Sequence, residues 1–140
     1  RQIRWPAFEL PRHEKDVGLR RRDRKGFSRL HVFAMVEYES ILYMDIDVLP
    51  LRKPDLMFDH PSVRSTSLPC LATPDWGRLQ HPPSTRPSGA VLFIRPSRRL
   101  YACMRNALHN STPSDFIDFE GEQGFLRHFF GDTISRLPVW

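Results

Sequence analysis

Two aspartates, Asp45 and Asp47, stand one residue apart at the end of an apolar run. The stretch reads Ile41-Leu42-Tyr43-Met44-Asp45-Ile46-Asp47-Val48-Leu49. Side chains two residues apart lie on one face of a strand, so we expect both carboxylates to point the same way. Such carboxylates repel each other unless a cation or a shared proton intervenes, and oxygen ligands suit Mg²⁺ or Mn²⁺. The pair predicts a divalent-cation site; the alternative is that both acids only end a strand or begin a turn.

The apolar run needs a sheet around it, because a run without polar alternation is typical of a strand buried on both faces in a parallel sheet. A helical pattern precedes it. Ser28 can cap that helix, which is predicted to end near Glu39-Ser40. Its apolar positions are Leu30, Phe33, Ala34 and Tyr38. A helix followed by a buried strand is the alternation of an α/β fold.

A second buried strand is predicted over residues 90–94, and the chain enters it through Ser88-Gly89. Ser97 can then cap an amphipathic helix with apolar residues at i, i+3, i+4, i+7 and i+8. These residues are Leu100, Cys103, Met104, Ala107 and Leu108. Because Cys103 lies on the apolar stripe, we expect it to pack in the core rather than react.

The remaining segments are predicted to be two helices, a long connection and a last strand. Pro54 fits the first turn of a short helix that lays Leu56, Met57 and Phe58 on the sheet. Residues 60–87 are rich in Pro, Ser and Thr, which is typical of a long connection. Another helix is predicted over 122–130, and a strand begins at 137–140. The helix should turn inward Phe125, Leu126, Phe129 and Phe130.

The size and charge of the chain limit the classes of protein it can belong to. Its 140 residues predict a single domain, 1–140, with a basic, irregular lead-in over residues 1–26. The net charge of +5 suits an anionic partner such as a nucleotide phosphate, nucleic acid or an acidic surface. No aromatic residue interleaves with the basic run at 20–25, so we interpret that run as a solvated loop and expect no nucleic-acid partner.

Two cysteines are too few for a disulfide framework; we expect two buried thiols, and a single disulfide is the alternative. No apolar run approaches the roughly 20 residues of a membrane span, so none is predicted. The chain starts at Arg1 without a Met or a signal peptide, which we interpret as an excerpt or a processed product. Any targeting signal would then lie upstream.

Six blocks, taken in order, resemble glycosyltransferase family 8 and, within it, the glycogenin-like branch. They lie at residues 27–33, 43–49, 72–75, 88–92, 95–97 and 123–126. Their order and spacing carry the resemblance, which covers the chain from about Phe27 to Trp140. The family implies a GT-A fold, a mostly parallel sheet between helices that binds a nucleotide-sugar. In this chain we expect that fold to be incomplete at both ends.

The resemblance also implies an activity and its site residues. Family members transfer a hexose from a UDP-sugar to a carbohydrate or protein acceptor with retention of configuration, using Mn²⁺, for which Mg²⁺ is an alternative. Asp45 and Asp47 match the DxD metal motif, which also lies against the donor. Arg29 stands where the family usually has a Lys that contacts the nucleotide; it keeps the charge and changes the geometry.

Four more positions match the sugar and acceptor side of the family's site. Ser88 and Gly89 match part of an Asn-Ser-Gly motif that lies against the sugar, although Pro87 replaces the Asn. Gln123 matches the second residue of an Asp-Gln pair that contacts donor and acceptor, with Glu122 in place of the Asp. The family's first strand would precede Arg1, and its third metal ligand, a His, would follow Trp140. We expect His128, inside a predicted helix, to lie at the surface rather than to bind metal.

Two alternatives remain open from the sequence. A haloacid-dehalogenase-like phosphatase also ends a buried strand in DxD, with the first Asp as nucleophile, the second as acid or base, and Mg²⁺. It would need a later strand that ends in an acidic pair, whereas the strand at 90–94 ends in Arg95-Pro96. The other alternative is a binding domain without catalysis, either a degenerate transferase or a basic module that contacts nucleic acid.

Overall fold

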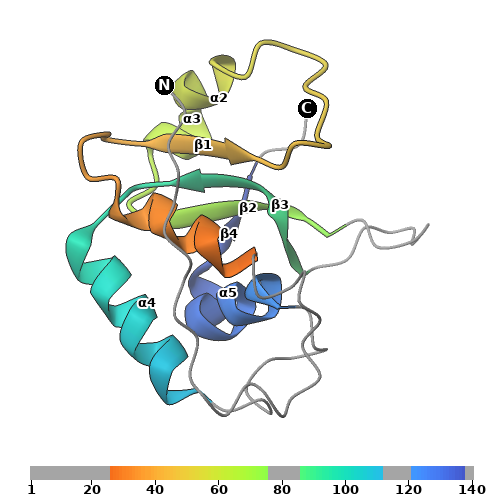
Figure 1. Cartoon of the computed structure of the whole chain (residues 1–140). Coiled ribbons are helices and arrows are strands. Elements are labelled where there is room, and N and C mark those ends of the chain that lie inside the picture. The colour runs from red at the N-terminus through yellow and green to blue at the C-terminus, as the bar shows by residue number, and fades with distance from the viewer. Residues whose placement is uncertain (1–25, 76–85, 112–120, 138–140) are drawn as a thin grey trace. The chain divides into compact units, whose positions relative to one another are not determined.

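The computed structural model describes residues 26–75, 86–111 and 121–137 of the chain (Figure 1). They form a mixture of helices and strands, which confirms the α/β class. The chain divides into two compact units. The first unit comprises residues 1–37 and 96–131, and the second comprises 38–95 and 132–140. Apart from Gly26, the predicted basic lead-in lies outside the described residues.

The second unit is built on a four-stranded sheet of order β1-β3-β2-β4, visible in Figure 1. The strands are β1 (Ile41–Met44), β2 (Cys70–Pro74), β3 (Pro87–Ile94) and β4 (Ser135–Arg136). Strand β3 is antiparallel to both β1 and β2, and among the described residues only the β2–β4 pair is parallel. The predicted mostly parallel sheet is therefore wrong. An apolar run reports burial and does not report the direction of the neighbouring strand, which is why the sequence misled here.

Strand β1 is shorter and less buried than predicted. It ends at Met44, and all four of its residues are half-buried, so the predicted burial on both faces is also wrong. The strand lies at one edge of the described sheet and has β3 as its neighbour there. It stops because the Val48 amide donates to the Asp45 carbonyl at 3.0 Å, which turns the chain.

Two short helices and the sheet enclose the core of the second unit. They are α2 (Leu56–Asp59) and α3 (Pro61–Arg64). Val63, Leu71, Phe93 and Leu137 form a cluster of buried apolar side chains in this core. Met57 packs against them as predicted, and the Phe58 ring meets Phe93 at a centroid distance of 5.5 Å. Leu56 is 53% exposed and Phe58 is 36% exposed, so the predicted apolar cover holds for Met57, in part for Phe58 through its contact with Phe93, and not for Leu56.

The predicted long connection of residues 60–87 contains α3 and β2, so this prediction is wrong for much of its length. Cys70, Leu71 and Ala72 are buried, and β2 lies between β3 and β4. Pro, Ser and Thr residues on both sides of this five-residue strand make it difficult to recognise from the sequence. Pro74, which ends β2, pairs with Pro87 after a shift in the register of the two strands.

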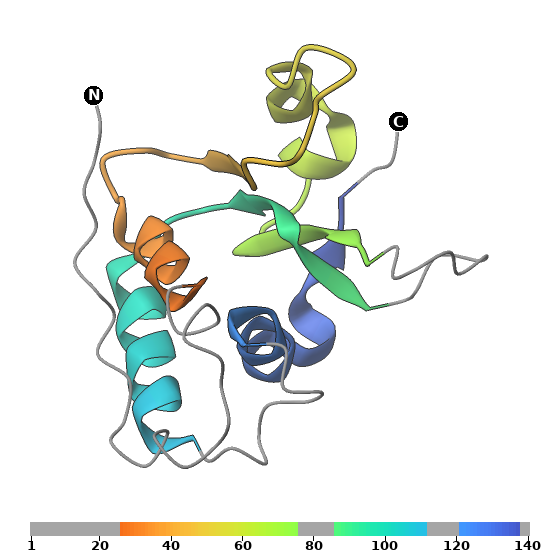
Figure 2. The ribbon, with the colours of Figure 1, turned by 45° about the vertical axis from the view of Figure 1, so that its right-hand side comes forward.

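The first unit contains the 3₁₀ helix η2 (Phe27–Ala34) and the α-helices α4 (Arg98–Asn110) and α5 (Glu122–Phe130). Figure 2 shows η2 beside α4, where the Tyr101 hydroxyl lies 2.6 Å from His31 Nδ1. The helix predicted to run to residue 40 ends at Ala34, and Tyr38 is 51% exposed. Ser28 lies inside η2 instead of capping it.

The other two helices were predicted correctly. Ser97 caps α4 by accepting a hydrogen bond from the Leu100 amide at 3.3 Å. Met104 and Leu108 are buried, whereas Cys103 is exposed, so its predicted core position is wrong. Residues four apart form the inner face of α4, and Cys103 falls outside that line. In α5 the buried apolar residues are Phe125, Leu126 and Phe130, with Phe129 half-buried.

At the end of the described chain, the predicted strand begins two residues early. Strand β4 occupies Ser135–Arg136, and Leu137 is buried with its amide donating to the Ala72 carbonyl at 2.8 Å. Residues 138–140 of the predicted strand lie outside the described residues. Gly131 (φ +48°) follows α5 and opens the short η5 helix (Gly131–Thr133). Within the described ranges, no helix has the length and hydropathy needed to cross a bilayer.

Candidate functional site

Three predicted site residues meet at one end of the sheet in the second unit. Pairing of β1 with β3 sets Met44 opposite Val91 and lets the Asp45 amide donate to the Ala90 carbonyl at 2.8 Å. Ser88 and Gly89 immediately precede Ala90, and the Ser88 hydroxyl accepts a hydrogen bond from the Ala90 amide at 3.2 Å. The antiparallel register thus brings Asp45 beside Ser88-Gly89, although the sequence separates them by more than 40 residues.

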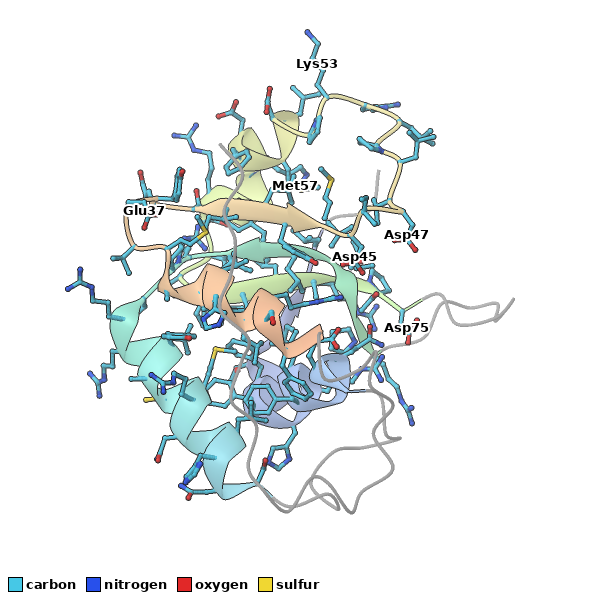
Figure 3. The ribbon with its side chains drawn as sticks, viewed as in Figure 1. Glu37, Asp45, Asp47, Lys53, Met57 and Asp75 are labelled. Carbon is cyan, nitrogen blue, oxygen red and sulfur yellow. The ribbon has the colours of Figure 1, made fainter. Side chains whose placement is uncertain are left out.

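Asp45 and Asp47 lie after β1, where Figure 3 shows both at the carboxyl end of the strand. The strand argument for a shared face is wrong, because the chain turns at Asp45 and Asp47 belongs to that turn. Ile46 between them is fully exposed. Asp47 is exposed, whereas Asp45 is half-buried and its Oδ1 accepts a hydrogen bond from the Tyr43 hydroxyl at 2.7 Å. Tyr43 therefore fixes one carboxylate, and the turn leaves the other open to solvent.

These two carboxylates are the described residues best suited to a hard cation. Among the residues that the structure describes, no three His, Cys, Asp or Glu side chains are grouped so that they could hold a metal ion. Mg²⁺ and similar ions commonly use one or two protein carboxylates and take their other oxygens from water and substrate phosphates. Two carboxylates that follow a strand, one exposed and one half-buried, fit that pattern.

Asp75 is a further acid at this end of the sheet, and the sequence argument did not select it. Strands β1 and β2 both run antiparallel to β3, so Asp45 and Asp75 follow strands that end on the same side (Figure 3). The Asp75 amide donates to the Arg86 carbonyl at 2.7 Å, which holds it next to the start of β3. The apolar residues Cys70, Leu71 and Ala72 were the signal for this strand in the sequence. They were missed because residues 60–87 were interpreted as a connection.

The remaining predicted residues lie in the first unit. Arg29 Nη1 and Glu122 Oε1 form an ion pair of 3.1 Å, with the two side chains 20% and 12% exposed. Gln123 is half-buried next to Glu122. Gly26 allows Glu122 to approach, because a Cβ at that position would overlap the Glu122 carboxylate. His128 is exposed, as predicted. Arg29, which was expected to contact the nucleotide, and Glu122, which was expected on the sugar and acceptor side, therefore form an ion pair with each other.

No family model matches the chain. Similar proteins include galactinol synthase 1 of Solanum lycopersicum, 24% identical over 124 residues, and a glycogenin of Komagataella phaffii, 29% identical over 121 residues. Each alignment covers 81% of this chain, but only 38% and 27% of those relatives. A glycogenin of Neurospora crassa is 29% identical over 113 residues. These similarities support a relationship of the chain to the glycogenin-like members of glycosyltransferase family 8.

Relatives named as glycogenin and galactinol synthase are family 8 glycosyltransferases, which use nucleotide-sugar donors. The chain spans well under half the length of the two relatives described first. The family 8 relationship disagrees with the phosphatase alternative. So does the segment after β3, because the strand ends at Ile94 and is followed by Arg95-Pro96 where a phosphatase would place an acidic pair.

Proposed function

We propose that this protein is a retaining hexosyltransferase of the GT-A type, which moves a hexose from a UDP-sugar to a carbohydrate or protein acceptor. The observation that carries the proposal is the pairing of β1 with β3, which brings Asp45 to Ser88-Gly89. In the family these positions serve the metal and the sugar. Their meeting at one strand end is what a donor site requires, and the sequence relationship to glycogenin and galactinol synthase supports it.

Asp45 and Asp47 would hold Mn²⁺, or Mg²⁺ in its place. The bound ion would supply positive charge against the negative charge that grows on the departing diphosphate. The residues of the chain have a separate task, which is to hold the carboxylates in place. Tyr43 does this for Asp45 through its hydroxyl, and the backbone bond from Asp45 to Ala90 fixes where the strand ends.

Arg29, Glu122 and Gln123 would serve the nucleotide, the sugar and the acceptor. The guanidinium of Arg29 can bind a diphosphate oxygen, since it presents several donors in a fixed fork. Its ion pair with Glu122 orients that fork. No side chain is assigned as a nucleophile. The family implies a front-face transfer in which the departing phosphate assists the acceptor.

Thermal unfolding with UDP tests the proposal, measured with and without Mn²⁺. A ligand at about 100 times its Kd adds roughly 2.7 kcal/mol to stability, which should clearly raise Tm. We expect a rise that needs both UDP and Mn²⁺ and is lost in Asp45→Ala. Asp59→Ala is the matched control, because Asp59 is an exposed acid of the same unit with only a 3.9 Å contact to Arg64.

The outcomes separate the candidate functions. Loss of the UDP response in Asp45→Ala with its retention in Asp59→Ala supports the donor site. A response to Mg²⁺ with phosphate analogues, and none to UDP, would support the phosphatase instead. A response that persists in Asp45→Ala would contradict the assignment of the DxD motif. With binding established, a screen of UDP-sugars for hydrolysis and transfer identifies the donor.

A further inference from the structure

The second unit contains a pocket whose lining includes none of the residues assigned to the donor site. Its volume is about 480 Å³, and it lies between β1, α2 and the chain that joins them. Apolar side chains make most of its wall, including Leu42, Met44, Met57 and Val91. Pockets of roughly 300–1,000 Å³ with apolar walls and few polar groups are typical of small-molecule sites. Figure 3 shows Lys53 away from Asp45 and Asp47, whereas the wall residues Met44 and Val48 adjoin these aspartates in the chain.

Two cations complete the wall of this pocket. Arg52 and Lys53 both line it and are exposed to solvent. Within the described ranges, neither side chain has an ion pair or a hydrogen bond. An apolar wall beside two unpaired positive charges complements a ligand with an apolar body and an anionic head.

The wall of the pocket can adapt to apolar groups of different shape. Met44 and Met57 carry flexible, polarisable side chains that adjust to ligands of different shape. Thr73 is the one uncharged polar residue of the wall, so the interior offers few groups for a polar ligand. A sugar or a nucleotide, whose hydroxyls need many partners, would bind poorly in such an interior.

We propose that this pocket binds a small amphipathic anion, with an apolar body against Met44 and Met57 and a carboxylate or phosphate head at Arg52 and Lys53. The pocket adjoins the proposed donor site through Met44 and Val48, and the proposed binding does not depend on transferase activity. An acyl chain of about ten carbons with an anionic head has the required chemistry and serves as the probe.

NMR on the full chain with ¹³C-methyl methionine tests the proposal directly, because the chain has four methionines. Met44 and Met57 line the pocket, whereas Met104 is fully buried in the first unit and reports whether the fold stays intact. We expect decanoate and decyl phosphate, below their micelle concentrations, to shift the Met44 and Met57 signals saturably. The Met104 signal should stay in place. The two probes show which head group binds more tightly.

Charge recognition is tested with the double variant Arg52→Gln/Lys53→Gln. Exposed ion pairs are each worth a few tenths of a kcal/mol up to about 1, so decanoate affinity should fall about three- to tenfold. Affinity for uncharged decanol should not change. Arg98→Gln/Arg99→Gln is the matched control, since it removes two exposed arginines from the start of α4. It should leave decanoate binding unchanged.

Three results would overturn the proposal. The first is no saturable shift at Met44 or Met57 with either anion. The second is equal affinity for decanoate and decanol together with no effect of the Arg52→Gln/Lys53→Gln variant, which would describe an apolar cavity without anion recognition. The third is a shift of both signals with protein concentration alone, which would assign the pocket to contact between two copies of the chain.

Discussion

Arg29 Nη1 lies 3.1 Å from Glu122 Oε1, and the two side chains are 20% and 12% exposed to solvent, respectively. The pair joins η2 to the first residue of α5 across more than 90 residues of sequence. A partly buried pair contributes more than a surface pair, because solvent screens it less. Glu122 also lies in the first turn of α5, where a carboxylate is favoured by the helix dipole.

A double-mutant cycle on Arg29→Gln and Glu122→Gln should give a coupling free energy of about 1 kcal/mol. Each single change already removes this ion pair, so the two effects should not add. Urea unfolding of the four proteins measures the coupling. The Arg64–Asp59 pair is the control: its atoms are 3.9 Å apart and its side chains 71% and 81% exposed, so its coupling should be near zero. Equal coupling for both pairs would contradict the role of burial.

Tyr43→Phe should weaken UDP binding in the presence of Mn²⁺ about three- to tenfold, and this prediction rests on the proposed function. The change removes the hydroxyl that donates to Asp45 Oδ1 at 2.7 Å, and a typical hydrogen bond contributes about 1 kcal/mol. Asp45 keeps its charge and its backbone bond to Ala90, so binding should weaken rather than vanish.

Isothermal titration with UDP at fixed Mn²⁺ measures the effect of Tyr43→Phe. Tyr38→Phe is the matched control, because Tyr38 lies in the same unit and is 51% exposed. The control should bind UDP as the unaltered protein does. Identical affinities for both variants would show that the Tyr43 hydroxyl does not position the carboxylate.

The sequence predictions succeeded where a structural element is determined by residues close together in the sequence. Helix α4 was predicted correctly because its cap at Ser97 and its buried residues Met104 and Leu108 follow from local spacing. Strand β2 was missed because Pro, Ser and Thr surround five residues, and only pairing with β3 and β4 makes them a strand. The direction of each strand relative to its neighbour is likewise determined by pairing between residues far apart in the sequence.

The same distinction applies to the candidate site. The DxD residues were found from their types and spacing alone, but the expected shared face failed because the turn at Asp45 depends on the bond from Val48. Asp75 was missed together with its strand. The pairing of Arg29 with Glu122 has no signal in the sequence, since nothing local relates η2 to α5.

Arg95→Met should lower the free energy of unfolding by about 2–4 kcal/mol. Arg95 donates from Nη1 to the Leu68 carbonyl at 3.1 Å and from Nη2 to the Val63 carbonyl at 2.8 Å. Hydrogen bonds to charged groups are worth roughly 1.5–3 kcal/mol each, and Met keeps the apolar stem. The fork thus holds the chain between α3 and β2.

Urea unfolding of Arg95→Met and Arg95→Lys measures this contribution. Lys keeps the charge but cannot reach both carbonyls with one fork, so its loss of stability should lie between those of Met and the unaltered protein. It also loses part of the contact over the Phe93 ring, which Arg95 makes at 5.4 Å. A loss below about 0.5 kcal/mol in Arg95→Met would show that water replaces the fork.

The two cysteines should differ sharply in reactivity. Cys103 is exposed on α4, whereas Cys70 is fully buried in β2, and burial raises the pKa of the Cys70 thiol to about 12. Since the thiolate is the nucleophile, the folded protein should consume one equivalent of a thiol reagent at pH 8 and a second only in denaturant. Two rapid equivalents from the folded chain would contradict the burial of Cys70.

The raised pKa of Cys70 also predicts a loss of stability in alkali. An unfolded thiol ionises near pH 8.5, whereas the folded one keeps its proton to about pH 12. The contribution is therefore fully present below pH 8.5 and falls as the pH rises, because the unfolded chain alone loses the proton. Burial raises the pKa of Tyr101 as well, so Tyr101→Phe should be the background for the measurement. In that background Cys70→Ala should flatten the decline of Tm between about pH 9 and 11, because in this range the unfolded thiol ionises and the folded one does not. An unchanged slope would assign the decline to other groups.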